Sequence, residues 1–322
     1  MRTIRLGRTN VQVPVISLGT WGHGGPNENN GVSVGWTGHD DAQAKEALVA
    51  AYRAGMTHWD TADAYGNGHA EQLIGEVFAS GEVPRDAIFL ATKFGWVTGP
   101  SKQFYDPKFM REQAERSLRL MKTDVLDLYY FHHCDFGDRL DDALEVMHRL
   151  RTEGKVRFIG LSDWAASKII KFIERVDPDV VQPYRNLVDD QYDSSGLKAY
   201  VDAHDLGVAF FSPLKHGLLL GKYDQPVDFG KGDFRSGVGD FQDAEAIARY
   251  KRASAAVRER FAQFSEPVLT AVTGALLPGN PTACVLLGQR NVRQVNAAAA
   301  AGEALSVEDA EWVQGQYRSS DV

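Results

Sequence analysis

The feature that most constrains this chain is an alternation of apolar segments with amphipathic segments, repeated eight times. The apolar segments are near-continuous runs such as "AIFLATKFG", which is typical of strands buried on both faces. Strict alternation of strands and helices predicts a parallel sheet. Eight such units in 322 residues favour a closed barrel over an open, doubly wound sheet. We therefore predict an α/β fold, a (β/α)8 barrel, as a single domain over residues 1–322.

The expected elements follow from periodicity and from capping and turn residues. Residues 2–15 are expected to form a short hairpin around "GRTN", and the tail is expected to start a helix with a capping box at Ser306 and Asp309. A long loop is expected after the seventh strand. The first strand ends near Gly19, and the other strands are expected at 57–61, 87–95, 124–132, 156–162, 179–183, 208–212 and 283–288. Helices are expected at 40–55, 70–80, 107–121, 140–154, 166–176, 194–207, 244–264 and 291–303.

Composition excludes several classes of protein. A net charge of −8 argues against nucleic-acid binding, which needs a basic face. Cys134 and Cys284 are far apart and form no CxxC pattern, which indicates a reducing compartment. We see no apolar segment typical of a signal peptide or a membrane span. These features predict a soluble cytoplasmic enzyme with neither a nucleic-acid nor a membrane partner.

Polar side chains that can take part in acid–base chemistry lie where the expected strands end. Asp60, Lys93 and His132 end the second, third and fourth strands, and Tyr65 follows in the loop after Asp60. Each has a structural alternative: a helix cap for Asp60, a solvated strand end for Lys93, and a satisfied core histidine for His132. Active sites of this barrel lie at the carboxyl ends of the strands. Taken together, the four side chains predict one catalytic site.

The stretch "FHHCD" carries types of residue that bind zinc. Adjacent residues on a strand point to opposite sides, so His132, His133 and Cys134 are not expected to share an ion. We predict no metal site.

The spaced motifs of the chain resemble those of the aldo-keto reductases, which are also similar to potassium-channel β subunits. The resemblance runs from "RLGRTNVQVPVISLGTW" to the last helix and is carried by "WDTADAYG", "ATKFG", "DLYYFHH", "GLSDW", "FFSPLKHGLLLGKY" and "LLGQRNVRQV". It implies a barrel closed at its bottom by a hairpin, and an enzyme that binds NADPH without a Rossmann domain and reduces aldehydes and ketones. "GTWGHGG" opens a loop instead of a helix, and is a weak dinucleotide signal.

The resemblance implies a catalytic tetrad of Asp60, Tyr65, Lys93 and His132. Hydride transfer to a carbonyl leaves an alkoxide that needs a proton, and Tyr65 is the implied donor. A tyrosine has a pKa of about 10, and we expect the Lys93 ammonium to lower it. Asp60 would hold Lys93 charged, and His132 would orient the substrate oxygen.

The resemblance also implies the residues that hold NADPH, with NADH as a possibility. Ser162, Asp163 and Gln182 match the clamp on the nicotinamide amide, and Arg290 matches the partner of the 2′-phosphate. The phosphate site after the eighth strand suits a helix N-terminus. The full set of implied cofactor contacts is Thr20, Trp21, Asp60, Ser162, Asp163, Gln182, Arg185, Phe211, Ser212, Pro213, Leu214, Gly217, Lys222, Arg235, Gly288, Gln289, Arg290 and Gln294.

The chain departs from the family pattern beside the nicotinamide. Asp163 stands where an asparagine is usual, and Arg185 stands where an aromatic ring is usual, unless a one-residue shift offers Tyr184. We hypothesise that Asp163 and Arg185 form an ion pair there; the alternative is that Arg185 points to solvent and Tyr184 stacks. Ala297 and Ala298 replace a Glu-Asn pair often found near the adenine.

Aromatic residues in the loops after the first and third strands are expected to line the substrate pocket: Trp21, Trp36, Phe94 and Trp96, with Phe104 and Tyr105 nearby. They favour aromatic or medium aliphatic aldehydes, with sugars as an alternative. Two other functions stay open. One is an NAD(P)-dependent aldose or polyol dehydrogenase, and the other is a non-catalytic NADPH-binding regulatory subunit.

Overall fold

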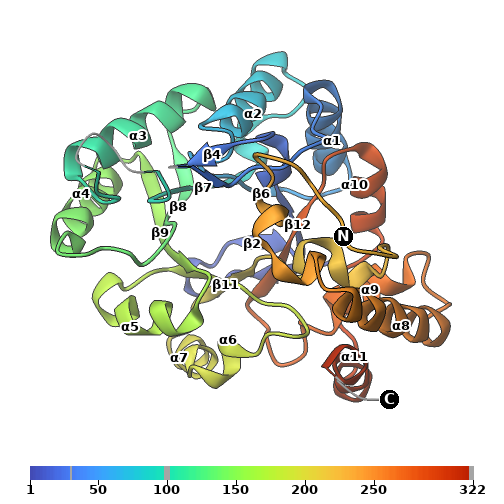
Figure 1. The fold of residues 1–322 in the computed structure, drawn as a ribbon. Coiled ribbons are helices and arrows are strands. Elements are labelled where there is room, and N and C mark those ends of the chain that lie inside the picture. The colour runs from blue at the N-terminus through green and yellow to red at the C-terminus, as the bar shows by residue number, and fades with distance from the viewer. Residues whose placement is uncertain (30, 98–101, 319–322) are drawn as a thin grey trace.

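Eight parallel strands close into a barrel in this computed structural model, which describes residues 1–29, 31–97 and 102–318. The strands follow one another around the barrel in chain order, and β12 pairs with β3 to close it, with Gly288 opposite Gly19 (Figure 1). The predicted (β/α)8 fold is therefore confirmed. The barrel strands are β3 (Ile16–Gly19), β6 (His58–Asp60), β7 (Phe89–Phe94), β8 (Leu126–Phe131), β9 (Val156–Asp163), β10 (Val180–Pro183), β11 (Gly207–Phe210) and β12 (Ala283–Gly288).

Helices surround the barrel on its outside (Figure 1). Asp40, Asp106 and Asp243 cap three of them, each side chain accepting from a backbone amide of the first turn. The helices are α1 (Asp41–Arg53), α2 (His69–Ser80), α3 (Pro107–Leu120), α4 (Leu140–Thr152), α5 (Ala166–Val176), α6 (Gln191–Ser194), α7 (Leu197–His204), α8 (Ala244–Arg260), α9 (Pro267–Gly274), α10 (Val292–Ala299) and α11 (Val307–Arg318).

Two helical regions differ from the sequence prediction. The helix expected over 194–207 is shorter, because α7 begins only at Leu197, after Gly196 with a left-handed φ of 84°, and the separate helix α6 before it was not predicted. Helix α9 was not predicted; Pro267 occupies its first position, where proline suits a helix. One half of the expected capping box of α11 is present, since Asp309 N donates to Ser306 Oγ at 3.0 Å, while the Asp309 carboxylate accepts from Arg260.

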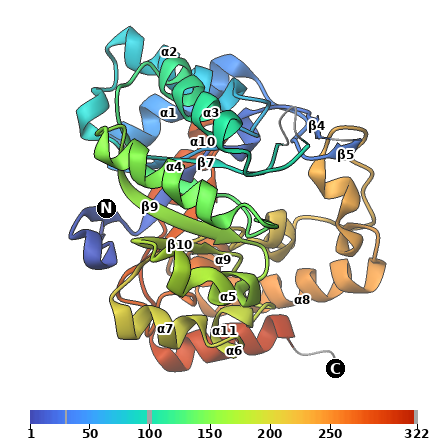
Figure 2. The same ribbon diagram turned by 90° about the vertical axis from the view of Figure 1, so that its left-hand side faces the viewer.

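An N-terminal hairpin closes one end of the barrel. Strands β1 (Thr3–Arg5) and β2 (Gln12–Pro14) pair antiparallel, and Leu6 and Val13 join the apolar cluster inside the barrel. Ion pairs from Arg5 to Asp205 and from Arg8 to Asp177 attach this hairpin to later segments. Figure 2 shows the N-terminal segment at one end of the barrel, with β4 (Glu28–Asn29) and β5 (Val32–Ser33) at the opposite end. The hairpin therefore leaves the opposite end of the barrel open as its mouth.

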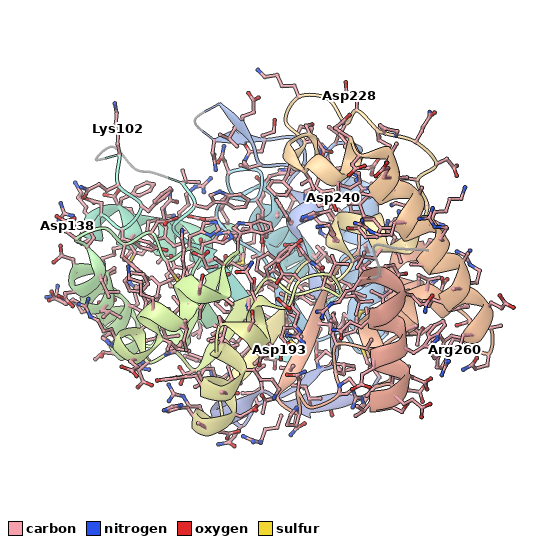
Figure 3. The ribbon with its side chains drawn as sticks, turned by 60° about the horizontal axis from the view of Figure 1, so that its bottom comes forward. Lys102, Asp138, Asp193, Asp228, Asp240 and Arg260 are labelled. Atoms are coloured by element: carbon pink, nitrogen blue, oxygen red, sulfur yellow. The ribbon has the colours of Figure 1, made fainter. Side chains whose placement is uncertain are left out.

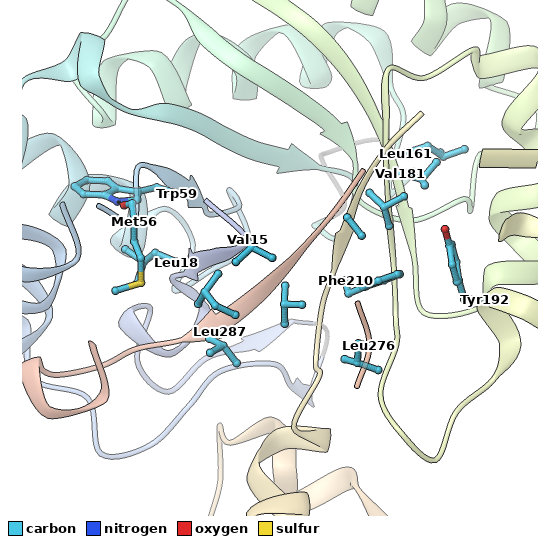
Figure 4. Close-up of a cluster of buried hydrophobic side chains, with 14 of the residues drawn as sticks. Val15, Leu18, Met56, Trp59, Leu161, Val181, Tyr192, Phe210, Leu276 and Leu287 are labelled. Carbon is cyan, nitrogen blue, oxygen red and sulfur yellow. Dashed lines mark hydrogen bonds between the residues drawn. The ribbon is translucent and has the colours of Figure 1, made fainter. Parts of the chain in front are cut away.

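The main hydrophobic core lies between the barrel and the helices. Side chains of each strand alternate, so that in β7 Phe89 and Ala91 face the barrel interior while Leu90 faces the helices. Figure 4 shows Trp59 of β6 beside Met56 and Leu18, and Trp59 Nε1 donates to the Met56 carbonyl. Each large apolar side chain buried there contributes about 1.5–3 kcal/mol.

Charged side chains lie on the outside of the molecule, as Asp138 and Asp228 in loops and Arg260 at the end of α8 show in Figure 3. Within the described ranges, no helix has both the length and the apolar character needed to cross a membrane.

Candidate active site

Strand geometry brings Asp60, Lys93 and His132 to one mouth of the barrel. Asp60 is the last residue of β6, Lys93 lies one residue before the end of β7, and His132 directly follows β8. Tyr65 reaches the same place from the turn after β6, where its amide donates to the Ala62 carbonyl. This turn packs tightly on the preceding loop: a Cβ on Gly24 would lie 2.6 Å from the backbone at Tyr65, so only glycine fits there.

The Lys93 ammonium is the centre of the site. Lys93 Nζ donates to Asp60 Oδ1 at 2.5 Å, to the Thr61 carbonyl at 2.8 Å and to the Tyr65 hydroxyl at 3.2 Å. Gln182 Nε2 donates to the second Asp60 oxygen at 2.8 Å. Burial raises the pKa of Asp60 and lowers that of Lys93, while their attraction opposes both shifts. The carboxylate thus has a partner on each oxygen, and the ammonium has three acceptors.

Tyr65 keeps its proton at neutral pH. Burial raises its pKa well above the ordinary value, and the Asp60 and Asp63 carboxylates raise it further. Our expectation that Lys93 lowers this pKa is therefore wrong for this structure. The physical reason is that burial disfavours the charged phenolate and the carboxylates of Asp60 and Asp63 add to the rise, which outweighs the nearby ammonium.

His132 is a neutral imidazole in the same pocket. Burial lowers its pKa well below the ordinary value, and the charges of His133 and Lys93 lower it further. Its ring packs edge-on against Tyr65 and Trp96, and its Nδ1 is buried without a hydrogen-bond partner. His132 and His133 stack with centroids 4.8 Å apart. The expectation that they point to opposite sides is wrong because β8 ends at Phe131, before the pair.

Aromatic rings surround Trp21 at the mouth. Trp36, Trp96, Trp164, Phe234 and His216 all lie within 6.3 Å of Trp21, centroid to centroid. Our sequence reasoning missed Trp164, Phe234 and His216. A signal existed for Trp164, which directly follows the fifth strand, and for His216, which lies inside "FFSPLKHGLLLGKY". Phe234 comes from the long segment after β11 and had no such signal.

Phe94 does not belong to this aromatic mouth, which corrects the expectation for it. Its ring is fully buried between β7 and α3, against Tyr105 and Phe109. Tyr105 is also buried there and donates its hydroxyl to the His133 carbonyl, while Phe104 packs against the same core. Because Lys93 faces the mouth, its strand neighbour Phe94 must face the helices.

The hypothesised ion pair between Asp163 and Arg185 is absent from the described structure. Asp163 accepts from the Cys134 amide at 2.8 Å and from the Ala165 amide at 2.9 Å. Arg185 instead lies buried on the helix side of the barrel and donates to Asp193 of α6, a residue labelled in Figure 3, so the alternative that it points to solvent is also wrong. Its guanidinium also lies over the rings of Tyr192 and Phe210. The hypothesis is wrong because alternation along the chain after Gln182 turns Arg185 away from the mouth.

Tyr184 occupies the mouth that Arg185 leaves. Its ring lies 5.4 Å from Trp164 and 5.5 Å from Phe211, centroid to centroid. Ser162 is buried opposite Gln182 on the neighbouring strand. The alternative that Tyr184 offers the stacking ring therefore agrees with its position.

The segment after β11 turns sharply around the residues expected to cover the pyrophosphate. Ser212, Lys215, His216 and Gly217 all have positive φ, which folds residues 212–217 into a compact turn. Pro213 is buried and Leu214 packs against the core. Lys222 is exposed, and its ammonium would lie 3.4 Å from a Cβ placed on Gly217. The turn thus places the Lys222 ammonium beside the backbone of Gly217.

Arg235 is engaged with its own segment. Its guanidinium donates twice to Asp233 and lies over the rings of Trp36 and Phe229. Asp233 also accepts from the amide and hydroxyl of Thr37. The long segment is therefore tied to the loop after β3, and Arg235 is not free to reach a ligand as expected.

Arg290 follows β12 and reaches the loop after β3. Its Nη1 donates to the Thr37 carbonyl at 2.8 Å, and its amide donates to Gln294 Oε1 at 2.8 Å. Gly288 is exposed, and a Cβ there would meet nothing within 4 Å, so this backbone is open to a ligand. Gln289 is buried, and its backbone carbonyl accepts a hydrogen bond from His23 Nε2 at 2.8 Å.

Thr20 has a different role from the expected one. It is fully buried, and its hydroxyl donates to the Asp60 backbone carbonyl at 3.0 Å. It therefore positions Asp60. The described cysteines, Cys134 and Cys284, are both buried and free.

Comparisons with known proteins agree on one family. The model of the Aldo/keto reductase family matches residues 15–314. Aldo-keto reductase str7 of Strobilurus tenacellus is 38% identical over 206 residues, which are 63% of this chain and 59% of that protein. Aldo-keto reductase YhdN of Bacillus subtilis (strain 168) is 30% identical over 236 residues, 73% of this chain and 68% of that protein. The solved glycerol dehydrogenase AKR11B4 of Gluconobacter oxydans superposes with a TM-score of 0.80 at 27% identity, covering 98% of this chain and 94% of that one.

Proposed function

The chain belongs to the aldo/keto reductase family, and from that premise we propose that it reduces aldehydes and ketones to alcohols with NADPH. The observation that carries the proposal is the buried Lys93 ammonium, which contacts both the Asp60 carboxylate and the Tyr65 phenol. A cytoplasmic location and a small-molecule carbonyl substrate are parts of the same proposal.

Tyr65 is the proposed proton donor. NADPH, when bound, supplies the hydride. Because burial keeps the phenol protonated, Tyr65 can deliver its proton to the substrate oxygen as negative charge develops there. Lys93 Nζ, 3.2 Å from the phenol oxygen, then stabilises the phenolate that remains.

The other residues hold this arrangement. Asp60 fixes Lys93, while Thr20 and Gln182 fix Asp60. Neutral His132 can donate a hydrogen bond to the same substrate oxygen and orient it. The rings around Trp21 give the mouth an apolar lining, which favours apolar or aromatic carbonyls.

The residues of the mouth fit a phosphate-bearing cofactor. Lys222 beside Gly217 and the open backbone at Gly288 offer a cation and room for close approach. Arg290 is the proposed partner of the 2′-phosphate, which would replace the Thr37 carbonyl as its acceptor. Ser162, Asp163 and Gln182 would hold the nicotinamide end, with Tyr184 as the stacking ring in place of Arg185.

The test is consumption of NADPH across a panel of carbonyl compounds, repeated with NADH. The Tyr65→Phe variant should keep its affinity for NADPH and lose roughly 10²-fold or more in turnover. Tyr200→Phe, on the outer helix α7, is the matched control and should leave turnover unchanged. A Tyr65→Phe enzyme that works at the parent rate would remove Tyr65 from the mechanism.

A second candidate is oxidation of polyols, favoured by the likeness to a glycerol dehydrogenase. It predicts faster turnover with glycerol and NAD⁺ or NADP⁺ than with any aldehyde in the reverse direction. The third alternative, a non-catalytic regulatory subunit, predicts tight NADPH binding without turnover on any substrate in the panel.

A further inference from the structure

We propose that His39, Asp41 and His69 form a binding site for a divalent transition metal ion of the zinc class. The three side chains come from separate places: His39 from the loop before α1, Asp41 from the first residue of α1, and His69 from the first residue of α2. They lie beside the barrel mouth and outside the tetrad. The site goes beyond the proposed reductase activity and does not depend on it.

The geometry is that of a nearly formed chelate. Asp41 Oδ1 lies 2.8 Å from His69 Nε2 and 3.8 Å from His39 Nε2, and the three ligand atoms lie within 4.8 Å of one another. Zinc bonds of 2.0–2.1 Å in tetrahedral geometry place ligand atoms roughly 3.3 Å apart. The distance from Asp41 to His69 is shorter than this value and the distance to His39 is longer, so an ion requires only small shifts of the three side chains.

The side chains can make that adjustment. His39 and His69 are about one-third exposed and Asp41 about half exposed, so each has room to turn, although one side of the His39 ring lies against Gly25. A hydrogen bond alone explains the position of His69 beside Asp41. It does not explain His39, whose Nε2 faces the same carboxylate oxygen beyond hydrogen-bond distance.

The chemistry of the set points to zinc, nickel or copper. Two imidazoles and one carboxylate suit these ions, whereas magnesium and calcium prefer oxygen ligands alone. The carboxylates of Asp40 and Glu76 make the surroundings negative, although Lys45 pairs with Glu76 and Arg290 bonds the Gly38 carbonyl. The partial positive charge at the N-termini of α1 and α2 disfavours a bound cation, but this effect is weak compared with three direct ligands.

A bound ion would join the mouth loop to α2. The His39 ring lies against Gly25, where a Cβ would be 2.7 Å from the ring, and the carbonyls of Thr37 and Gly38 hold Arg290. The ion would thus fix residues 37–41 against the start of the second helix. Thermal stability should rise as it binds.

The experiment is a calorimetric titration of the full chain with ZnCl₂, alongside variants His39→Ala and His69→Ala. Even the loss of a residue that only supports a ligand costs 10–100-fold in metal affinity, so each variant should bind zinc at least about 10-fold more weakly. His148→Ala, an exposed histidine on α4, is the matched control and should bind zinc like the parent.

A second measurement keeps the test independent of folding. At one fixed zinc concentration, the thermal midpoint should rise clearly more in the parent and in His148→Ala than in His39→Ala, His69→Ala or Asp41→Asn. Far-ultraviolet circular dichroism identifies a variant that fails to fold, and the remaining variants then decide. Equal zinc affinity in the parent and in His39→Ala, or equal weakening in His148→Ala, would overturn the site.

Discussion

Replacing Lys93 with methionine should lower stability, because Asp60 loses its ion-pair partner, and should lower activity, because Tyr65 loses the neighbouring positive charge. The Lys93 and Asp60 side chains are 1% and 4% exposed, with 2.5 Å between their charged atoms. Removing one partner of a buried pair costs about 3–5 kcal/mol, because the other charge stays buried and uncompensated. Asp60 would keep the Gln182 amide as a partner, so we expect the lower part of that range. Turnover should fall roughly 10²-fold or more, since the phenolate of Tyr65 loses its stabilising charge.

A second substitution separates the two effects. Adding Asp60→Asn to Lys93→Met removes the uncompensated carboxylate, so the double variant should recover stability and show a coupling of about 0.5–3 kcal/mol. It should not recover turnover. Urea unfolding measures the stability and NADPH consumption measures the activity. Lys45→Met, which breaks the exposed pair with Glu76, is the control and should cost about 1 kcal/mol or less. Additive losses in the double variant would refute the argument that the pair is a single electrostatic unit.

Three further expectations follow from the same structure. Arg290→Ala should weaken NADPH binding by about 1.5–3 kcal/mol and spare NADH, measured by fluorescence titration; equal loss for both cofactors would contradict the 2′-phosphate role. Because Asp163 bonds backbone amides while Arg185 bonds an outer helix, Asp163→Asn and Arg185→Tyr should act additively on the NADPH dissociation constant, within about 0.5 kcal/mol. Burial lowers the pKa of His23 to about 4 and that of His58 to about 3. Unfolding therefore takes up protons below about pH 6.5, and each histidine should cost about 2 kcal/mol of stability at pH 5 relative to pH 7. Urea midpoints at the two pH values check this, and an unchanged midpoint would contradict it.

The positions of the proposed catalytic side chains were predictable because strand ends are strong sequence signals. Asp60, Lys93 and His132 each close an apolar run, and parallel strands bring such ends together. The alternation of side chains along a strand, with a period of two residues, also predicts the orientations of Phe94 and Arg185 that differ from our expectations. Lys93 facing the mouth implies that Phe94 faces outward, and Gln182 facing the mouth implies the same for Arg185.

Other features lay beyond sequence reasoning for physical reasons. The pKa of Tyr65 depends on how deeply the phenol is buried and on how close the Asp60 and Asp63 carboxylates lie to it. Both can be known only from atomic positions. Phe234 and Asp233 reach the mouth from a segment built of short 3-10 turns, where no periodicity relates sequence to direction. The pairing of His39 with His69 through Asp41 likewise depends on how two helices start beside each other.

The closure of β12 onto β3 sets the order in which this chain can fold during its synthesis. The first barrel strand needs a partner that ends at Gly288, and Arg2 also bonds the Gly302 carbonyl. At 5–20 residues per second, a ribosome takes roughly 15–60 s to reach that strand. Until then, the nascent chain is an open sheet with β3 and β11 as unpaired edges, which is a template for aggregation. The barrel can therefore close, and its strand edges can be paired, only after about nine-tenths of the polypeptide has been made. A chain truncated before residue 283 should depend on chaperones to avoid aggregation.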